Sequence, residues 1–427
     1  MNNRTPERVV VIGGGVVGTT TALALVERGL NVTLVDRQTD AAAETSHANG
    51  GGLTPAHSEP WNAPGLLGKL LRNLGRADAP YRLSPLALPG MGTWGLRFLA
   101  NMRRERFVAN ARNNIRLGLY SLECLRRWRA RYDMAYHQTV SGSMQVYFSR
   151  ELMAESVQFR RELLQGRAEI QPIGVDEVIA REPALAPVRR DLAGAIVFPD
   201  HESGDACRFS QVAAEQAAAG GAQLRFGTRV ESIRVESGRF RSVVTDQGEI
   251  EADACVVAAG PETPALTRPL GLRLPIYPVR GYSATFEIDR EDVLPTLPML
   301  DTASRFVTLR LGERGLRVAG LADFAGHNRR IVPRRVECLL AGARRLLPDL
   351  ADELLADKAE LWAGLRPVTP DGVPLLGETR IPGLYLNAGH GPMGWTMACG
   401  SAELVAAEVC GDDPAFDAGE AYRVDRA

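Results

Sequence analysis

Long apolar runs are missing from this sequence of 427 residues. No stretch reaches the roughly 18 consecutive apolar residues that a membrane-spanning helix needs, so we expect no transmembrane segment. The first predicted strand begins at Val9, which leaves no room for a signal peptide ahead of it. These features predict a cytoplasmic protein.

Cysteine is scarce and scattered. The six cysteines include no Cys-x-x-Cys pair, and no histidines stand near them at metal-ligand spacing. We therefore expect reduced thiols and no metal site. An excess of charge is also lacking, because 50 Lys and Arg nearly balance 51 Asp and Glu. A net charge of −1 argues against generic nucleic-acid binding.

Low-complexity tracts and internal repeats are absent too. Hydrophobic residues make up 45% of the chain and charged residues 24%, which is typical of a globular protein. The length is sufficient for two domains of ordinary size, each with its own core.

Positive charge is nevertheless concentrated in residues 66–131, here called the basic region. It contains fourteen Lys and Arg but only three Asp and Glu. Leucine, tryptophan and phenylalanine are interleaved with these cations, as in a surface helix that lies on anionic lipid. A solvated helical face whose apolar side packs on the protein core is the alternative. The sequence leaves both interpretations open.

The N-terminal sequence has the pattern of a strand, a glycine-rich turn, a helix and a second strand. After the apolar residues 9–12, Gly13 allows a tight turn, Gly15 lets a pyrophosphate approach the backbone, and Gly18 lets the helix pack closely. Asp36 ends the second strand, where its carboxylate can accept hydrogen bonds from ribose hydroxyls. The free N–H groups at the start of the helix favour phosphate. This pattern predicts a dinucleotide-binding βαβ unit.

Three other segments also indicate contact with a ligand. Residues 44–52 are too polar and rich in glycine for a core element, so we expect a loop beside the ligand. Residues 254–260 form an apolar run that ends in glycine, which predicts a buried parallel strand. A second glycine-rich loop at 388–395 precedes an Ala-rich helix, and its N-terminus directs another positive dipole end at a ligand.

The remaining patterns predict helices and antiparallel strands. The basic region looks mainly helical, with Pro80, Pro85 and Pro89 breaking it into pieces. Helices are predicted at 150–164, 209–219, 333–347 and 396–409, and alternating strands at 282–288, 306–311 and 316–319.

These elements predict an α/β protein with two domains. A Rossmann-type nucleotide domain is expected to be discontinuous in sequence, made of residues 1–64, 190–268 and 362–427. A second α+β domain for the substrate, made of residues 65–189 and 269–361, is expected to contain the antiparallel sheet and the basic region. A nicotinamide enzyme usually completes its site in one contiguous domain. A long cofactor in an interrupted domain therefore favours FAD.

Several motifs resemble the bacterial D-amino acid dehydrogenase small subunit family, which belongs to the flavoprotein amine and amino-acid oxidase superfamily. They are residues 9–18, Thr45-Ser46 with Asn49-Gly50, and residues 279–283, 364–372 and 387–400. The resemblance covers nearly the whole chain, and the last two motifs are specific to the family. The sequence departs from its relatives at His47, where they often carry a small residue, and at Arg280, where they often carry lysine.

The resemblance implies an FAD-binding Rossmann-type domain. Its expected contacts with FAD, which also include the glycine turn and Asp36 identified above, come from all parts of the chain. They are Gly13, Gly15, Val16, Val17, Gly18, Asp36, Arg37, Thr45, Ser46, Asn49, Gly50, Gly51, Val230, Ala259, Gly260, Gly389, His390, Gly391, Met393, Gly394, Trp395 and Thr396. Some relatives attach flavin through a cysteine near residues 364–366. This sequence has none there, so we expect non-covalent FAD.

The activity that the resemblance implies is oxidation of a D-amino acid to a 2-oxo acid and ammonia, by hydride transfer from Cα to flavin N5. The substrate must then be held by its carboxylate, and the planar fork of Arg366 matches that group. Its alternative role is an ordinary ion pair. Tyr282 and Arg280 are candidates for a second carboxylate contact or a wall, with structural packing as the alternative. His47 could line the site or cap its loop. His390 is expected to shape the flavin pocket rather than transfer a proton.

The physiological acceptor is expected to be a quinone or another respiratory-chain carrier. The membrane interpretation of the basic region, with contact at the inner face of the cytoplasmic membrane, agrees with such an acceptor, and the alternative of a solvated helical face stays open. Three alternatives remain open. The chain could oxidise a cyclic imino acid such as 4-hydroxy-D-proline, or it could be an oxidase that passes electrons from glycine, sarcosine or a D-amino acid to oxygen. It could also be a non-catalytic flavin-binding redox sensor.

Overall fold

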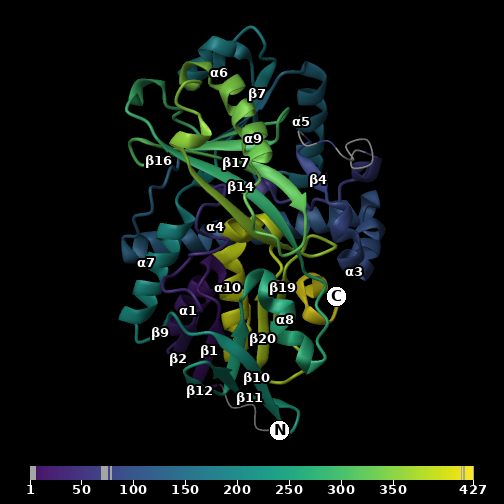
Figure 1. The fold of residues 1–427 in the computed structure, drawn as a ribbon, viewed down its shortest axis with the longest axis vertical. Helices are drawn as coiled ribbons and strands as arrows, with labels where there is room; N and C mark the ends of the chain where they lie inside the picture. Colours follow the sequence, from purple (N-terminus) through teal and green to yellow (C-terminus); the bar gives the residue numbers. More distant parts are fainter. Residues whose placement is uncertain (1–5, 69–75, 77–78, 415, 417–418, 427) are drawn as a thin grey trace.

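The computed structural model describes residues 6–68, 76, 79–414, 416 and 419–426. Two main sheets lie one above the other along the long axis of the molecule. Helices α4 (Arg104–Tyr132) and α10 (Gly394–Cys410) lie in the middle and pack against each other (Figure 1).

The first sheet has six strands and includes the N-terminal strand near its centre. Every neighbouring pair is parallel except the edge pair β19 and β20. Its order is β19 (Leu375–Glu378), β20 (Leu384–Ala388), β13 (Ala254–Val257), β1 (Arg8–Ile12), β2 (Asn31–Val35) and β9 (Gln223–Arg225). The carboxyl ends of β1, β2 and β13 therefore share one edge, where ligands bind in folds of this kind.

The β1 strand is apolar throughout because both faces of this sheet are covered. Val9 and Val11 pack with residues of α1 (Val16–Glu27), α7 (Ala206–Ala219) and α10. Val10 and Ile12 point the other way, toward the three-stranded sheet of β10 (Val230–Glu236), β11 (Arg239–Thr245) and β12 (Gly248–Glu251). Strands buried on both faces have this continuous apolar character.

The second sheet has nine strands and is mainly antiparallel. Its order is β18 (Glu360–Val368), β14 (Tyr277–Glu287), β17 (Gly315–Phe324), β16 (Phe306–Leu311), β15 (Met299–Asp301), β5 (Ser143–Tyr147), β7 (Gly194–Phe198) and β6 (Gln171–Ile173), with β4 (Tyr81–Leu83) added beside β17. Helix α9 (Pro333–Leu346) and α6 (Val175–Arg181) pack on one face, and α5 (Arg150–Leu164) lies toward the other.

Short elements complete the chain. Strands β3 (Gly52–Leu53) and β8 (Glu202–Ser203) form a small pair, and α3 (Leu88–Ala100) and α8 (Thr263–Thr267) are the remaining helices described. Among the described residues, no helix is both long and apolar enough to cross a bilayer. Over the same residues, no group of three or more potential ligands from His, Cys, Asp and Glu is placed to hold a metal ion.

Several elements differ from the expectation. Pro89 lies in the first turn of α3 instead of breaking a helix, since that position needs no backbone N–H. Residues 81–83 of the basic region form a strand, and residues 69–75 and 77–78 lie outside the described part of the chain. Strands β7 and β18 pair with β5 and β14 in the nine-stranded sheet, although the ranges expected for the nucleotide domain contain β7 and most of β18.

Candidate active site

A cavity of about 690 Å³ lies where the two sheets face each other, and both sheets contribute to its lining. Its volume is within the range of roughly 300–1,000 Å³ that small-molecule and cofactor sites occupy. Of the residues expected to contact the cofactor, all except Gly18 line this one cavity. Arg366 and Tyr282 line it as well, whereas Arg280 and His47 do not.

The glycine turn leaves room for a ligand at the edge of the first sheet. Gly13 has a φ of +112°, and a Cβ there would lie 2.5 Å from the carbonyl oxygen of Ala258. A Cβ on Gly18 would lie 1.7 Å from the carbonyl oxygen of Gly13, so Gly18 is needed for packing inside the turn. A Cβ on Gly15, in contrast, would meet only Ser46 Oγ, at 3.4 Å. The turn is therefore tight on its protein side and open toward the cavity.

Asp36 is fixed at the end of β2 by two backbone amides. Its Oδ2 accepts a hydrogen bond from Gly14 N at 2.6 Å, and its Oδ1 accepts one from Gln38 N at 2.7 Å. Burial raises the pKa of this carboxyl, although the two amide bonds act in the opposite direction. Each oxygen has a further lone pair, so the carboxyl can also accept bonds from ribose hydroxyls.

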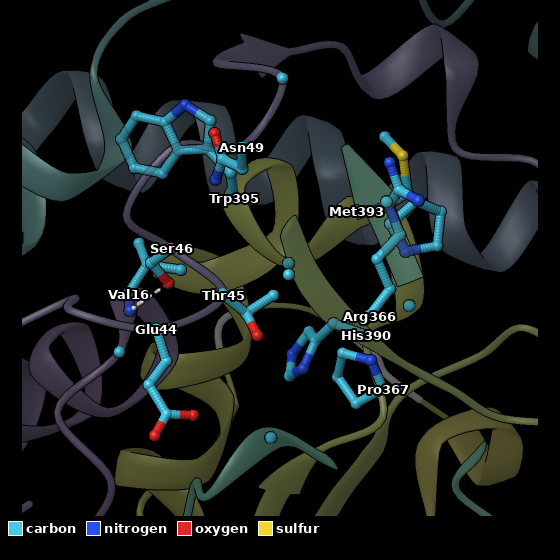
Figure 2. A pocket seen from close by; sticks show the side chains of 18 of the residues that line it. Val16, Glu44, Thr45, Ser46, Asn49, Arg366, Pro367, His390, Met393 and Trp395 are labelled. Carbon is cyan, nitrogen blue, oxygen red and sulfur yellow. Dashed lines mark hydrogen bonds between the residues drawn. The ribbon is translucent and has the colours of Figure 1, made fainter. Parts of the chain in front are cut away.

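The loop after β2 connects the glycine turn to the second sheet. Ser46 Oγ accepts a hydrogen bond from Val16 N at 3.1 Å, and Thr45 Oγ1 donates one to the carbonyl oxygen of Leu365 at 2.9 Å. In Figure 2, Thr45 and Ser46 lie on one side of the pocket, and Arg366 lies on the other side of the view. The loop thus forms a wall between the βαβ unit and β18.

The second glycine loop brings the N-terminus of α10 to the same cavity. Trp395 Nε1 donates a hydrogen bond to the carbonyl oxygen of Gly51 at 3.2 Å, and Thr396 Oγ1 donates one to that of Gly52 at 3.2 Å. No side chain caps the start of α10, so its first N–H groups are available to a ligand. These groups and the helix dipole favour negative charge in the cavity.

His390 is a structural part of this loop. Its Nε2 lies 3.0 Å from Ser401 Oγ, and burial lowers the pKa of the imidazole to about 3. The ring therefore stays neutral at physiological pH, as expected for a residue that shapes the pocket.

These hydrogen-bonding groups and the open room at the glycine turn fit FAD. The open glycine turn suits a pyrophosphate, the Asp36 carboxylate suits a ribose, and the uncapped N-terminus of α10 suits an electron-poor ring system that gains negative charge on reduction. No cysteine of the described chain lines the cavity, which is compatible with non-covalent binding.

Arg366 projects from β18 into the cavity without a carboxylate partner. Its Nη1 donates a hydrogen bond to the carbonyl oxygen of Leu321 at 2.8 Å, and its Cζ lies 5.2 Å from the centre of the Trp61 ring. Burial lowers the pKa of the guanidinium to about 10. Among the described residues, no acid lies within ion-pair distance of Arg366. A half-buried guanidinium without an acidic partner is suited to an anionic ligand.

The backbone beneath Arg366 is adapted to this placement. A Cβ on Gly281 of β14 would lie 2.3 Å from Arg366 Cζ, so only glycine lets the guanidinium lie across this strand. Leu321, whose carbonyl accepts the hydrogen bond, has a φ of +59° and lies where the pairing of β14 with β17 shifts register. Such strained positions often occur at functional sites.

Arg280 and the hydroxyl of Tyr282 belong to a different network, buried against α9. Tyr282 Oη donates a hydrogen bond to Asp323 Oδ2 at 2.8 Å, and Arg280 Nη2 donates one to the same oxygen at 3.0 Å. Arg335 of α9 pairs with the other carboxylate oxygen at 3.0 Å. The physical reason is the alternation of β14, where Val279, one residue before Arg280, pairs directly with Arg366.

His47 lies at the outer edge of the loop. Its Nε2 is 3.3 Å from Glu360 Oε1, and its Nδ1 is 3.8 Å from Cys207 Sγ. The half-exposed ring thus packs beside the loop, as in the capping role considered for it. Burial raises the pKa of the Cys207 thiol to about 11, which keeps the thiol protonated.

An ionic cluster of four side chains lies at the nucleotide-binding side of the cavity. It consists of Arg37, Glu44, Glu262 and Arg329. Arg329 Nη2 lies 2.7 Å from Glu44 and 3.3 Å from Glu262, and Arg37 Nη2 lies 2.6 Å from Glu44. Burial by itself raises the pKa of Glu44, but hydrogen bonds from Arg329, Gln38 and Arg37 outweigh this and lower it to about 2. The cluster connects the loop after β17 to the nucleotide-binding loops.

Several cavity residues were not identified from the sequence. Trp61 and Tyr81 form an aromatic wall, with ring centres 6.0 Å apart. His57 and Gln145 line another part. These residues come from isolated turns and short strands, and no local motif marks them.

The comparisons with known proteins agree with this geometry. Residues 8–408 match the family described as FAD dependent oxidoreductase. A protein named D-amino acid dehydrogenase from Paramagnetospirillum magneticum is 46% identical over 411 residues, which cover 95% of each chain. A protein of the same name from Dechloromonas aromatica is 40% identical, with 95% of this chain and 98% of the relative covered.

Solved structures show the same fold at lower identity. L-proline dehydrogenase from P. horikoshii superposes with a TM-score of 0.76 at 18% identity, covering 98% of both chains. Glycine oxidase from Geobacillus kaustophilus superposes with a TM-score of 0.73 at 23% identity, covering 99% of both chains.

Proposed function

The chain belongs to the FAD dependent oxidoreductase family and is an FAD-dependent enzyme, and from this premise we propose that it is a D-amino acid dehydrogenase. The observation that carries the proposal is the half-buried guanidinium of Arg366, which faces the cavity without a carboxylate partner among the described residues. Relatives that share 37–46% identity over most of the chain are named D-amino acid dehydrogenase.

Arg366 binds the substrate carboxylate in this proposal. Its Nη1 bond to Leu321 and its contact with Trp61 hold the guanidinium plane, so the remaining donors present a fixed fork to the ligand. Trp61 and Tyr81 provide an aromatic wall beside this fork. Fixing the carboxylate orients the substrate Cα, and such positioning is a large part of catalysis.

FAD, when bound, supplies the acceptor for the hydride that leaves Cα. The uncapped N-terminus of α10 stabilises negative charge at its end of the cavity. His390 remains neutral and holds the loop through Ser401, so it is not assigned a proton-transfer step. The imino acid product is then hydrolysed by water to a 2-oxo acid and ammonia.

We further propose that electrons pass to a quinone or a related respiratory-chain carrier, with the enzyme bound to the inner face of the cytoplasmic membrane. The support is a surface on α3 and at the start of α4, here called the α3 surface. Its leucines Leu88, Leu96 and Leu99 are exposed, and Arg97 and Arg103 are exposed beside them. Apolar and cationic side chains together favour anionic lipid surfaces.

Anaerobic reduction of the purified yellow protein tests the function. We expect D-alanine to bleach the flavin and L-alanine to leave it oxidised, and a soluble quinone to reoxidise it much faster than oxygen does. Glycine, sarcosine and 4-hydroxy-D-proline serve as competing substrates in the same assay. Rapid stoichiometric peroxide release would identify an oxidase instead. Failure of every amine to bleach the flavin would contradict the enzymatic proposal.

A further inference from the structure

The lining of the cavity includes polar side chains that the proposed function does not use. Among them are Gln145 of β5 and His57, which follows β3 in the chain. Ser143 and Glu59 line the cavity as well. We call Gln145 and His57 the polar end of the cavity.

Gln145 is buried with an unused acceptor. Its side chain points to the cavity side of the nine-stranded sheet, because Gln145 pairs with Ile196, which belongs to the cluster of Phe107 and Ala56 on that face. Only 7% of the residue is exposed, and within the described chain its Oε1 has no hydrogen-bond partner. A buried amide oxygen without a partner is destabilising, and a hydrogen-bond donor on a ligand would remove this cost.

His57 provides the second unused atom. Its Nε2 is buried and has no hydrogen-bond partner in the described part of the chain. Burial, and then the charge of Arg160, lower the pKa of the imidazole well below its ordinary value. The polar side chain of Gln145 faces the ring and acts in the opposite direction, but no hydrogen bond of ordinary length joins His57 Nε2 to Gln145 Oε1. The ring is therefore neutral, and the polar end recognises ligands by hydrogen bonds rather than by charge.

The other polar groups nearby already have partners. Ser143 Oγ lies 2.8 Å from His201 Nδ1, and the other ring nitrogen of His201 accepts a hydrogen bond from Ala56 N at 3.2 Å. Both carboxylate oxygens of Glu59 accept hydrogen bonds from Arg160, at 2.5 and 2.8 Å. Gln145 and His57, in contrast, each combine a place in the lining with a buried atom that has no hydrogen-bond partner in the described chain.

One chain segment connects this end to Arg366. Trp61, whose ring lies against the Arg366 guanidinium, is four residues after His57, so their Cα atoms are at most about 14 Å apart. Apolar side chains of the nine-stranded sheet, Val307, Leu300 and Leu321, line the same cavity. A ligand held by its carboxylate thus has an apolar surface available before it reaches the polar end.

We propose that the polar end is a subsite for the end of the substrate side chain, and that it selects D-amino acids with a neutral hydrogen-bonding group such as a carboxamide. The inference rests on the proposed function and narrows its substrate class. A carboxamide offers both a donor and an acceptor, which suits Gln145 Oε1 and a neutral imidazole. An apolar end of the same shape would leave both atoms unpaired.

Isosteric pairs of substrates test the subsite. D-asparagine is compared with D-leucine, and D-glutamine with D-homoleucine, by steady-state kinetics with an artificial electron acceptor. We expect kcat/KM to favour the amide by about tenfold or more in at least one pair. In Gln145→Leu, the ratio of kcat/KM for the amide to kcat/KM for its apolar isostere falls to near one or below one. The control Gln158→Leu, at an exposed position on α5, keeps the ratio of the unmodified enzyme.

Equilibrium binding provides a readout that needs no variant and no turnover. The flavin absorbance change reports binding of 4-carbamoylbutanoate and of its isostere 5-methylhexanoate, and we expect the amide to bind about tenfold or more tightly. Equal affinities, with D-alanine still bleaching the flavin, overturn the subsite and leave the proposed function intact. D-glutamate used as well as D-glutamine also overturns it, because recognition would then depend on a cation. If no D-amino acid bleaches the flavin, the proposed function fails, and the pair of analogues still decides the preference of the polar end.

Discussion

Arg366 is a half-buried cation, and its hydrogen bond within the described chain goes to a carbonyl rather than to a carboxylate. Most buried charges in proteins are paired. The surroundings keep this one charged and oriented: Leu321 accepts a bond, Trp61 presents its ring face, and Gly281 leaves the space. At the residue scale, the capacity to bind a carboxylate depends on these three contacts as well as on the arginine.

Changing Arg366 should therefore affect substrate binding more than cofactor binding. We expect Arg366→Lys to raise KM for D-alanine roughly tenfold or more, because lysine keeps the charge but loses the planar fork. Arg366→Ala should raise it by about 100-fold or more, as truncation of one partner of a buried charge pair costs roughly 2–5 kcal/mol. Steady-state kinetics measure KM, and the flavin spectrum reports whether FAD is retained. Unchanged KM in both variants would show that Arg366 does not bind the substrate carboxylate.

The individual residues of the site also show what a sequence can and cannot predict. Gly13, Gly15 and Asp36 lie within one βαβ unit, so their spacing was enough to predict that they lie together, and they line one cavity. Arg366 was found through a family motif. That Arg280 points away from the cavity, toward α9, depends on the alternation of β14 against β18, which only the paired strands define. Gln145 shares no motif with Arg366 and reaches the cavity through tertiary pairing alone.

Helix α3 illustrates, at the scale of elements, the limits of prediction from the sequence. Its leucines and Arg97 were visible in the sequence, but the sequence did not tell which leucines the core would cover. Trp94 and Phe98 are buried and pack with Tyr277 and Phe324, whereas Leu96 is 70% exposed and Leu99 is 42% exposed. The α3 surface is therefore apolar where a membrane could contact it.

Vesicle binding should show whether the α3 surface contributes more to lipid binding than other exposed leucines do. We expect the protein to sediment with vesicles that contain anionic phosphatidylglycerol, more weakly with neutral vesicles, and more weakly at high salt. The double variant Leu96→Ser and Leu99→Ser should lower the partition coefficient at least about tenfold, because each leucine contributes roughly 1.5–3 kcal/mol on full burial.

Leu152→Ser is the matched control, since Leu152 is 59% exposed on the separate helix α5. Its partition coefficient should equal that of the unmodified protein. Equal binding by the double variant and the control would show that α3 is not the contact with lipid.

At the scale of the whole molecule, the ionic cluster joins the parts of the chain that carry the two sheets. Glu44 lies on a loop of the nucleotide-binding part, and Arg329 follows β17 of the nine-stranded sheet. Because both side chains are partly exposed, we expect the pair to contribute only about 1 kcal/mol or less.

The pKa of Glu44 gives this contribution a defined pH dependence. Its folded pKa of about 2 lies below the ordinary value of 4.5, so the stabilisation is complete above pH 4.5 and is lost as pH falls toward 2. Glu44→Gln should lower the urea midpoint at pH 6, and the difference from the unmodified protein should shrink at pH 3. Glu177→Gln, which removes an exposed pair within α6, serves as the control. A difference that does not change with pH would contradict this assignment.

The first sheet takes its inner strands from the beginning, the middle and the end of the chain, since β1 pairs with β13, and β13 with β20. During translation, the N-terminal turn therefore emerges from the ribosome long before the strand and helix that complete its binding site. A nascent chain that stops before Leu384 lacks both β20 and α10. Loading of the coenzyme is thereby postponed until synthesis is nearly finished, and truncated products should remain colourless.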